Sequence, residues 1–102
     1  MMNELIAAVT ALVGDETQRA KETHDETYAS LHEGYGVLAE EVWEAGEELQ
    51  LIEAYKQAVL SAIHLDNDQI GAWLREVERT AINAACECIQ VAAVARKMRE
   101  GL

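Results

Sequence analysis

Two pairs of oxygen-bearing side chains have a spacing that could build a metal site. Glu41 and Glu44 form one pair, and Glu87 and Gln90 form the other. Each pair is spaced i, i+3, so on a helix both members lie on one face, one turn apart. Hard divalent cations such as Mg²⁺ and Mn²⁺ prefer oxygen ligands of this kind. The pattern predicts metal chemistry wherever two helices bring the pairs together.

Two long helices are predicted to carry these pairs. Ser30 and Glu33 form a capping-box pattern, which predicts the start of a helix that runs to about His64. The polar run 66–68 predicts a turn, and a second helix then runs to about Met98. Apolar residues recur along both segments at steps of mostly three and four, and no proline interrupts them. We therefore expect an all-α fold built on a long antiparallel helical hairpin.

The register of this hairpin predicts which side chains meet. If the turn lies between Leu65 and Asn67, residues on the two arms face each other when their numbers sum to about 131 or 132, because both helices rise equally per residue. Glu44 then faces Glu87, and Glu41 faces Gln90. We expect these four residues to form one cluster of metal ligands.

The surroundings of Glu87 strengthen this prediction. The stretch 84–95 contains only two strongly polar side chains, Glu87 and Gln90, and a helix that is apolar nearly all round is expected to be buried. A buried carboxylate is protonated, paired or metal-bound. The alternative to a metal site is an ion pair of Glu87 with a base elsewhere in the bundle, for which the candidates are Lys21, Arg19 and Arg75.

One stretch of the predicted hairpin also resembles a known family. Residues 30–44 read SLHEGYGVLAEEVWE, which resembles the MazG-like, all-α nucleoside triphosphate pyrophosphatases and their EExxE signature at Glu40, Glu41 and Glu44. Their second signature, ExxD, corresponds to residues 87–90, where Glu87 matches and Gln90 stands in place of the aspartate.

The resemblance implies a function. Glu41, Glu44 and Glu87 would be the catalytic residues that hold Mg²⁺, with Mn²⁺ as a substitute, and a nucleoside triphosphate would be split into the monophosphate and pyrophosphate. Gln90 offers a neutral oxygen, so its substitution for aspartate is expected to weaken metal affinity and could leave the fold without turnover. A triphosphate also needs cationic side chains, for which the candidates are Lys21, Arg19, Arg96 and Lys97.

Composition excludes other classes of function. The net charge of −11, with eight Lys and Arg, argues against binding to nucleic acid phosphates. Residues 5–13 are apolar but lack a basic flank and a cleavage site, and no apolar run reaches membrane-spanning length.

Cys86 and Cys88 are too far apart around a helix to share a disulfide, so we expect them to be buried thiols in a reducing compartment, the cytoplasm.

The chain is predicted to form a single domain, 1–102, in which residues 30–102 form the hairpin. In the N-terminal segment, 1–29, a helix from Asn3 to Val13 is expected to stop or kink at Gly14, and a second short helix to run from Glu16 to about His24.

This short segment cannot cover the apolar surface of the last helix, so a homodimer or homotetramer is expected. The alternative to an enzyme is a non-catalytic acidic helical module that binds a protein partner.

Overall fold

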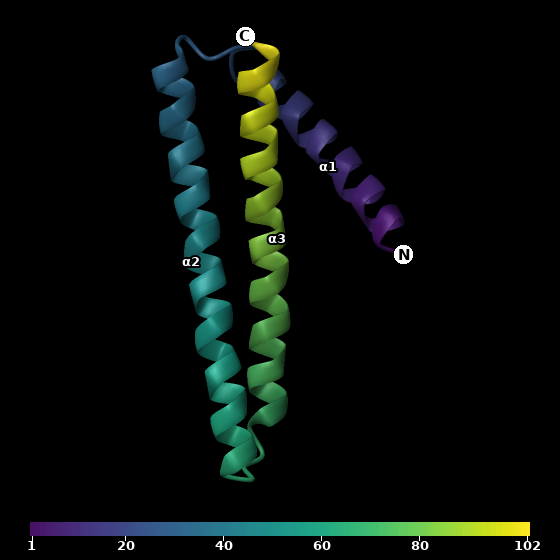
Figure 1. The fold of residues 1–102 in the computed structure, drawn as a ribbon, viewed down its shortest axis with the longest axis vertical. Coiled ribbons are helices and arrows are strands. Elements are labelled where there is room, and N and C mark those ends of the chain that lie inside the picture. The colour runs from purple at the N-terminus through teal and green to yellow at the C-terminus, as the bar shows by residue number, and fades with distance from the viewer.

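The protein folds into three helices and no strand. A computed structural model describes residues 1–102 and contains α1 (Met2–Thr23), α2 (Leu31–His64) and α3 (Ile70–Glu100). Helices α2 and α3 run antiparallel along their whole length, whereas α1 packs against the C-terminal half of α3 only (Figure 1). The predicted all-α fold is confirmed.

The ends of the hairpin helices show the chemistry that the sequence predicts. The hydroxyl of Ser30 accepts a 3.1 Å hydrogen bond from the backbone N–H of Glu33. The Glu33 carboxylate accepts one from the N–H of Ala29, which completes the capping box. At the turn between the arms, Asp66 adopts a positive φ of 48°. Asp tolerates this left-handed conformation better than most residues, which explains a polar residue at this point.

The predicted break at Gly14 is wrong, because α1 is one continuous helix. Gly14 does not adopt positive φ. Glycine lowers helix stability by only about 1 kcal/mol, which tertiary packing can offset. That packing is visible at Gly14, where an added β-carbon would lie 3.2 Å from Nη1 of Arg96 on α3. The glycine thus allows the guanidinium of Arg96 to pass close to the α1 backbone.

The monomer is extended and has a small core. Its radius of gyration is 17.4 Å, against about 13 Å for a compact chain of this length. Only ten residues are buried, and the side chains that fill the α2–α3 contact are small, among them Ala45, Ala62, Ala84 and Ala93. Small residues let two helix backbones approach closely, but they bury little apolar area.

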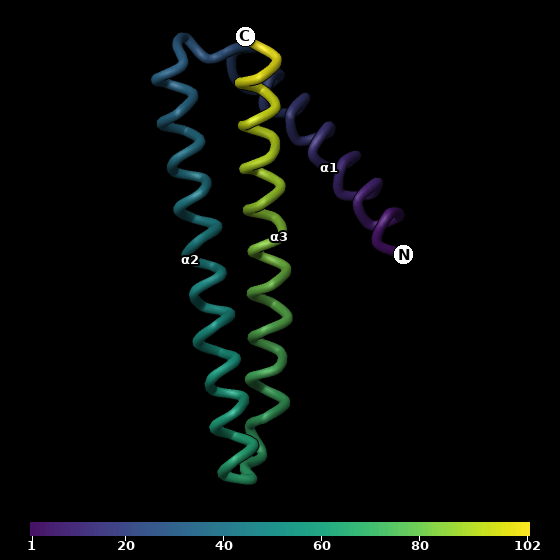
Figure 2. Tube along the Cα trace, viewed as in Figure 1, coloured from purple at the N-terminus to yellow at the C-terminus, as the bar shows by residue number.

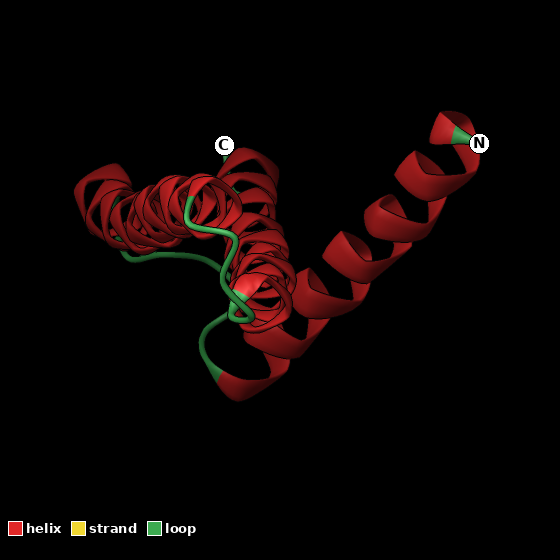
Figure 3. Ribbon diagram, turned by 90° about the horizontal axis from the view of Figure 1, so that it is seen from below, coloured by secondary structure: helices red, strands yellow, loops and turns green.

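Several predictions of burial are wrong for the single chain. Cys86 and Cys88 are exposed. Large apolar side chains are also exposed on both arms of the hairpin, including Val42, Leu49, Ile63, Leu74 and Ile82. The reason is that α3 has only two neighbours, and α1 leaves it toward the N-terminus (Figures 2 and 3). None of the three helices is long and apolar enough to span a membrane.

Candidate metal centre

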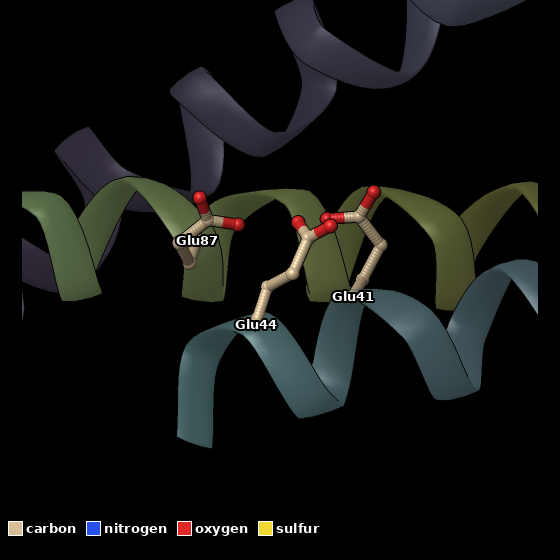
Figure 4. Close-up of side chains that lie close together, drawn as sticks. All are labelled: Glu41, Glu44 and Glu87. Atoms are coloured by element: carbon tan, nitrogen blue, oxygen red, sulfur yellow. The ribbon is translucent and has the colours of Figure 1, made fainter. Parts of the chain in front are cut away.

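The hairpin brings Glu41, Glu44 and Glu87 together, and we call these residues the glutamate triad. One carboxylate oxygen from each lies within 4.8 Å of the others. Glu41 and Glu44 project from successive turns of α2, and Glu87 projects from α3 toward them (Figure 4). The meeting of Glu44 with Glu87 follows the register that the sequence predicts.

The triad is partly exposed, so the predicted full burial of Glu87 is wrong. Partial burial is nevertheless sufficient to affect its titration. Burial raises the pKa of Glu87, and the charge of the neighbouring Glu44 raises it further. The pKa of Glu41 is raised by burial first and then by the charges of Glu44 and Glu87. Repulsion between like charges in the cluster therefore favours the protonated forms of Glu41 and Glu87.

The bases proposed as alternative partners of Glu87 do not pair with it. Lys21 forms a 2.7 Å ion pair with Glu100, and Arg19 pairs with Glu16. Arg75 forms no ion pair. The triad thus has no basic partner within the chain.

Gln90, the fourth predicted ligand, is turned toward α1. Its Nε2 donates a 2.7 Å hydrogen bond to Oε1 of Glu16, which also accepts from the Arg19 guanidinium. Glu16 lies close enough to Glu41 to raise its pKa. The pKa of Glu16 itself is lowered, mainly by Arg19.

Glu16 is therefore a fourth carboxylate beside the triad, and we did not predict it from the sequence. The sequence nevertheless contains a pattern that indicates it. Glu16 is three residues after Val13 and four before Ala20, so the three side chains lie on one face of α1, the face that packs against a neighbour. A glutamate on the apolar face of a short helix indicates a partner there.

A pocket of about 420 Å³ opens beside the triad, between α1, the 24–30 linker and the hairpin. We call it the linker pocket. Its wall includes one triad member, Glu41, and the neighbouring pair Glu16 and Gln90. It also includes Tyr28, whose aromatic ring stands 4.3 Å from Nζ of Lys97.

The four bases proposed to bind substrate lie in different places, and Arg19, which pairs with Glu16, lines the linker pocket. Lys97 lines the linker pocket and is only 4% exposed. Lys21 lies near the C-terminal end of α3, bound to Glu100. Arg96 lines a separate groove between α1 and α3 together with Arg99, away from the triad.

Comparisons with known proteins identify no relative. No family model, curated protein or solved structure matches the chain. The fold and the side-chain geometry are therefore the grounds for any functional conclusion.

The donor set of the triad suits a hard divalent cation. Three carboxylates from two helices supply three oxygens, and the positive charge of a cation would relieve their mutual repulsion. In an octahedral Mg²⁺ site, neighbouring ligand atoms are about 3 Å apart. The oxygens of the triad lie within 4.8 Å of one another, so side-chain rotations that bring them closer would be needed for all three to hold one ion.

Proposed function

We propose that the protein is a Mg²⁺-dependent nucleoside triphosphate pyrophosphohydrolase, which releases a nucleoside monophosphate and pyrophosphate. The observation that carries the proposal is the glutamate triad, three carboxylates from two helices with no basic partner in the chain. The choice of reaction rests on the resemblance of residues 40–44 and 87–90 to the signatures of MazG-like enzymes.

In this mechanism Glu41, Glu44 and Glu87 hold the cation. When bound, Mg²⁺ neutralises phosphate charge and lowers the pKa of water, the two contributions that phosphoanhydride hydrolysis requires. The part played by the chain is to fix the three carboxylates on rigid helices and to leave one side of the cluster open to substrate. The partial exposure of the triad provides that open side.

Gln90 places a further carboxylate beside the triad. The family pattern has aspartate at the position of Gln90. Here the amide of Gln90 holds the Glu16 carboxylate, which comes from another helix. Arg19 orients Glu16 from its other side and balances its charge. The negative charge that would hold the cation therefore comes from the three glutamates of the triad.

The enzyme works as a homodimer or homotetramer in this proposal. The extended shape and the many large apolar side chains exposed on the hairpin support assembly, because a second chain could cover them. A second chain would also approach the open side of the triad and could add basic residues to it.

The test is a screen of canonical and modified nucleoside triphosphates, with Mg²⁺ and with Mn²⁺, that detects pyrophosphate. Wild type should release pyrophosphate from at least one substrate, and Glu44→Gln should lose that activity. Glu47→Gln is the matched control, because Glu47 is exposed one turn further along α2 and is not part of the triad. Equal activity of Glu44→Gln and wild type would refute the catalytic role of the triad.

A second candidate function is favoured by the exposed apolar faces. In this alternative the chain is a non-catalytic helical module whose hairpin binds a protein partner, and the carboxylates serve solubility. Carboxylates gather on acidic helices without any ion as well, so metal binding separates the two functions. No pyrophosphate release with either metal, together with a melting temperature that Mg²⁺ leaves unchanged, would favour the module.

A further inference from the structure

The groove between α1 and α3 is lined by two arginines that form no ion pair in the chain. Arg96 and Arg99 are part of its wall, beside Val9 and Val13 of α1, and none of the four ion pairs includes either arginine. Helix α1 diverges from α3 toward its N-terminus (Figures 1 and 3), and Val9 lies on the diverging half. A partner that fits this groove should therefore be apolar and carry a negative charge.

A segment with both properties occurs on α3 itself. Glu78 is exposed, and it too forms no ion pair. Steps of three and four residues from Glu78 reach five small side chains and then Arg99, so all of them lie on one face of the helix. The five are Ala81, Ala85, Cys88, Ala92 and Ala95, of which only Ala92 is not exposed.

We call this surface, from Glu78 to Arg99, the small-residue face of α3. It is continuous with the groove, because Ala92 and Ala95 also line the groove.

We propose that a second copy of this chain docks its α3 in the groove, so that the small-residue faces of two antiparallel α3 helices meet about a twofold axis. The proposal rests on the assembly in the proposed function and identifies the face through which it forms. Charge decides the direction, because parallel helices would bring Glu78 to Glu78 and Arg99 to Arg99. Antiparallel helices bring Glu78 to the partner's Arg96 and Arg99. The twofold axis repeats this contact at both ends and closes it at two copies.

This pairing of charges sets the register of the two helices. With Glu78 placed between the two arginines of the partner, the numbers of facing residues sum to about 176, because both helices rise equally per residue. Ala81 then faces the partner's Ala95, and Cys88 lies at the axis, where it faces the partner's Cys88. Small side chains thus meet along the contact, which allows the two helix backbones to approach closely.

The two thiols of the chain distinguish this interface from others. Cys86 lies about 160° from Cys88 around α3, so it points away from the proposed axis. Both thiols are exposed in the single chain. Without the proposed interface, therefore, neither thiol has a reason to lie nearer to its counterpart in a second copy.

The first experiment links neighbouring chains through their thiols with a short bis-maleimide, at micromolar protein. Wild type and Cys86→Ser should form a covalent dimer. Cys88→Ser should form little, although it keeps an equally exposed thiol, so Cys86 is the matched control. Equal linkage through either cysteine, or a dimer that does not link through Cys88, would overturn the interface. A monomer mass for wild type in light scattering would overturn it as well.

The second experiment reverses the charges and measures the dimer dissociation constant by analytical ultracentrifugation. Glu78→Arg and Arg99→Glu should each weaken the dimer by about 5- to 30-fold, because like charges then meet at two symmetric contacts. The double variant should restore the wild-type constant, since each altered residue again meets the opposite charge. Failure of the double variant to recover would overturn the proposed register.

Glu47→Arg is the matched control, because it makes the same change of charge at an exposed position of α2. Each chain has a net charge of −11, so added positive charge lowers the general repulsion between two copies. Glu47→Arg should therefore leave the dimer unchanged or tighten it. A response of Glu78→Arg equal to that of Glu47→Arg would refute the contact with the arginines.

The interface and the proposed enzyme function fail separately. A dimer that links through Cys88 but releases no pyrophosphate would refute the enzyme function alone. Pyrophosphate release by a protein that fails the linkage experiment would refute the interface alone.

Discussion

The side-chain amide of Gln90 on α3 donates a 2.7 Å hydrogen bond to the carboxylate of Glu16 on α1. This bond joins residues that are 74 positions apart in the sequence. It ties α1 to the hairpin beside the glutamate triad, and the Lys21–Glu100 ion pair ties α1 to the C-terminal end of α3. Gln90 therefore makes a structural contact with Glu16 and also lies next to the proposed metal ligands.

The first prediction concerns Gln90→Asp, which has opposite effects on the apo and the metal-bound protein. The new carboxylate would face Glu16 without a donor, so the free energy of unfolding of the apo protein should fall by about 1–3 kcal/mol. Mg²⁺ should bind more tightly, because one more negative charge surrounds it. Thermal unfolding with EDTA and with Mg²⁺ measures both effects. Gln57→Asp is the control, since Gln57 also donates to a glutamate but at an exposed site.

The second prediction concerns Glu87→Ala. This variant should no longer bind Mg²⁺, while the stability of the apo protein should change by less than about 1 kcal/mol or rise, since a partly exposed carboxylate without a basic partner is removed. Calorimetric titration and chemical denaturation measure the two quantities. Glu78→Ala, at an exposed position of α3, is the control. A large loss of apo stability would mean that Glu87 has a stabilising partner in the protein.

The third prediction is a pH dependence. Because the pKa values of Glu41 and Glu87 are raised in the folded state, the folded protein holds more protons than the unfolded chain above the ordinary value of 4.5. Their contribution to stability is complete below that value and is lost as the pH rises through the raised pKa values. Mg²⁺ competes with these protons, so its stabilising effect should grow over the same range.

Melting temperatures of wild type and Glu44→Gln from pH 4 to 8, in EDTA, test the prediction. Glu44 is the charged neighbour with the largest effect on both carboxyl groups. Wild type should therefore lose stability relative to Glu44→Gln as the pH rises. Glu16, Glu40 and Glu48 add smaller effects, which both proteins share. A constant difference across this range would contradict a coupled cluster.

The fourth prediction is self-association. Light scattering at micromolar protein should give the mass of a dimer or tetramer, because the apolar side chains of the hairpin are uncovered in one chain. Ile82→Glu, which places a charge on the exposed face of α3, should lower the mass to that of a monomer. Gln18→Glu, on the side of α1 opposite its apolar residues, should not. A wild-type monomer with cooperative unfolding would contradict the predicted assembly.

Local signals in the sequence were sufficient to predict the hairpin. The capping box at Ser30 and Glu33 and the polar turn at Asp66 depend on neighbouring residues, which the sequence shows directly. Once the turn of the hairpin is placed, the equal rise per residue of the two helices predicts that Glu44 lies opposite Glu87.

Features that depend on packing between distant segments could not be predicted in the same way. In the sequence alone Gly14 resembles a helix stop, because its packing against Arg96, from the far end of the chain, is not visible there. Glu16 and Tyr28 join the site only because α1 crosses α3 at one particular place. Burial of Cys86 and Cys88 was overestimated because periodicity marks an apolar face and says nothing of what covers it.

The N-terminal half of α1 is expected to be the least stable part of the fold. Residues 1–12 are all exposed, so the first half of α1 has little tertiary support. An isolated helix of about a dozen residues is marginal in water. Its amides should exchange with deuterium within seconds, while those of α3 near Ala93 and Val94 should exchange only through global unfolding. If residues 2–12 exchange more slowly as the protein concentration rises, a second chain covers α1. The protected amides will then identify the residues that it covers.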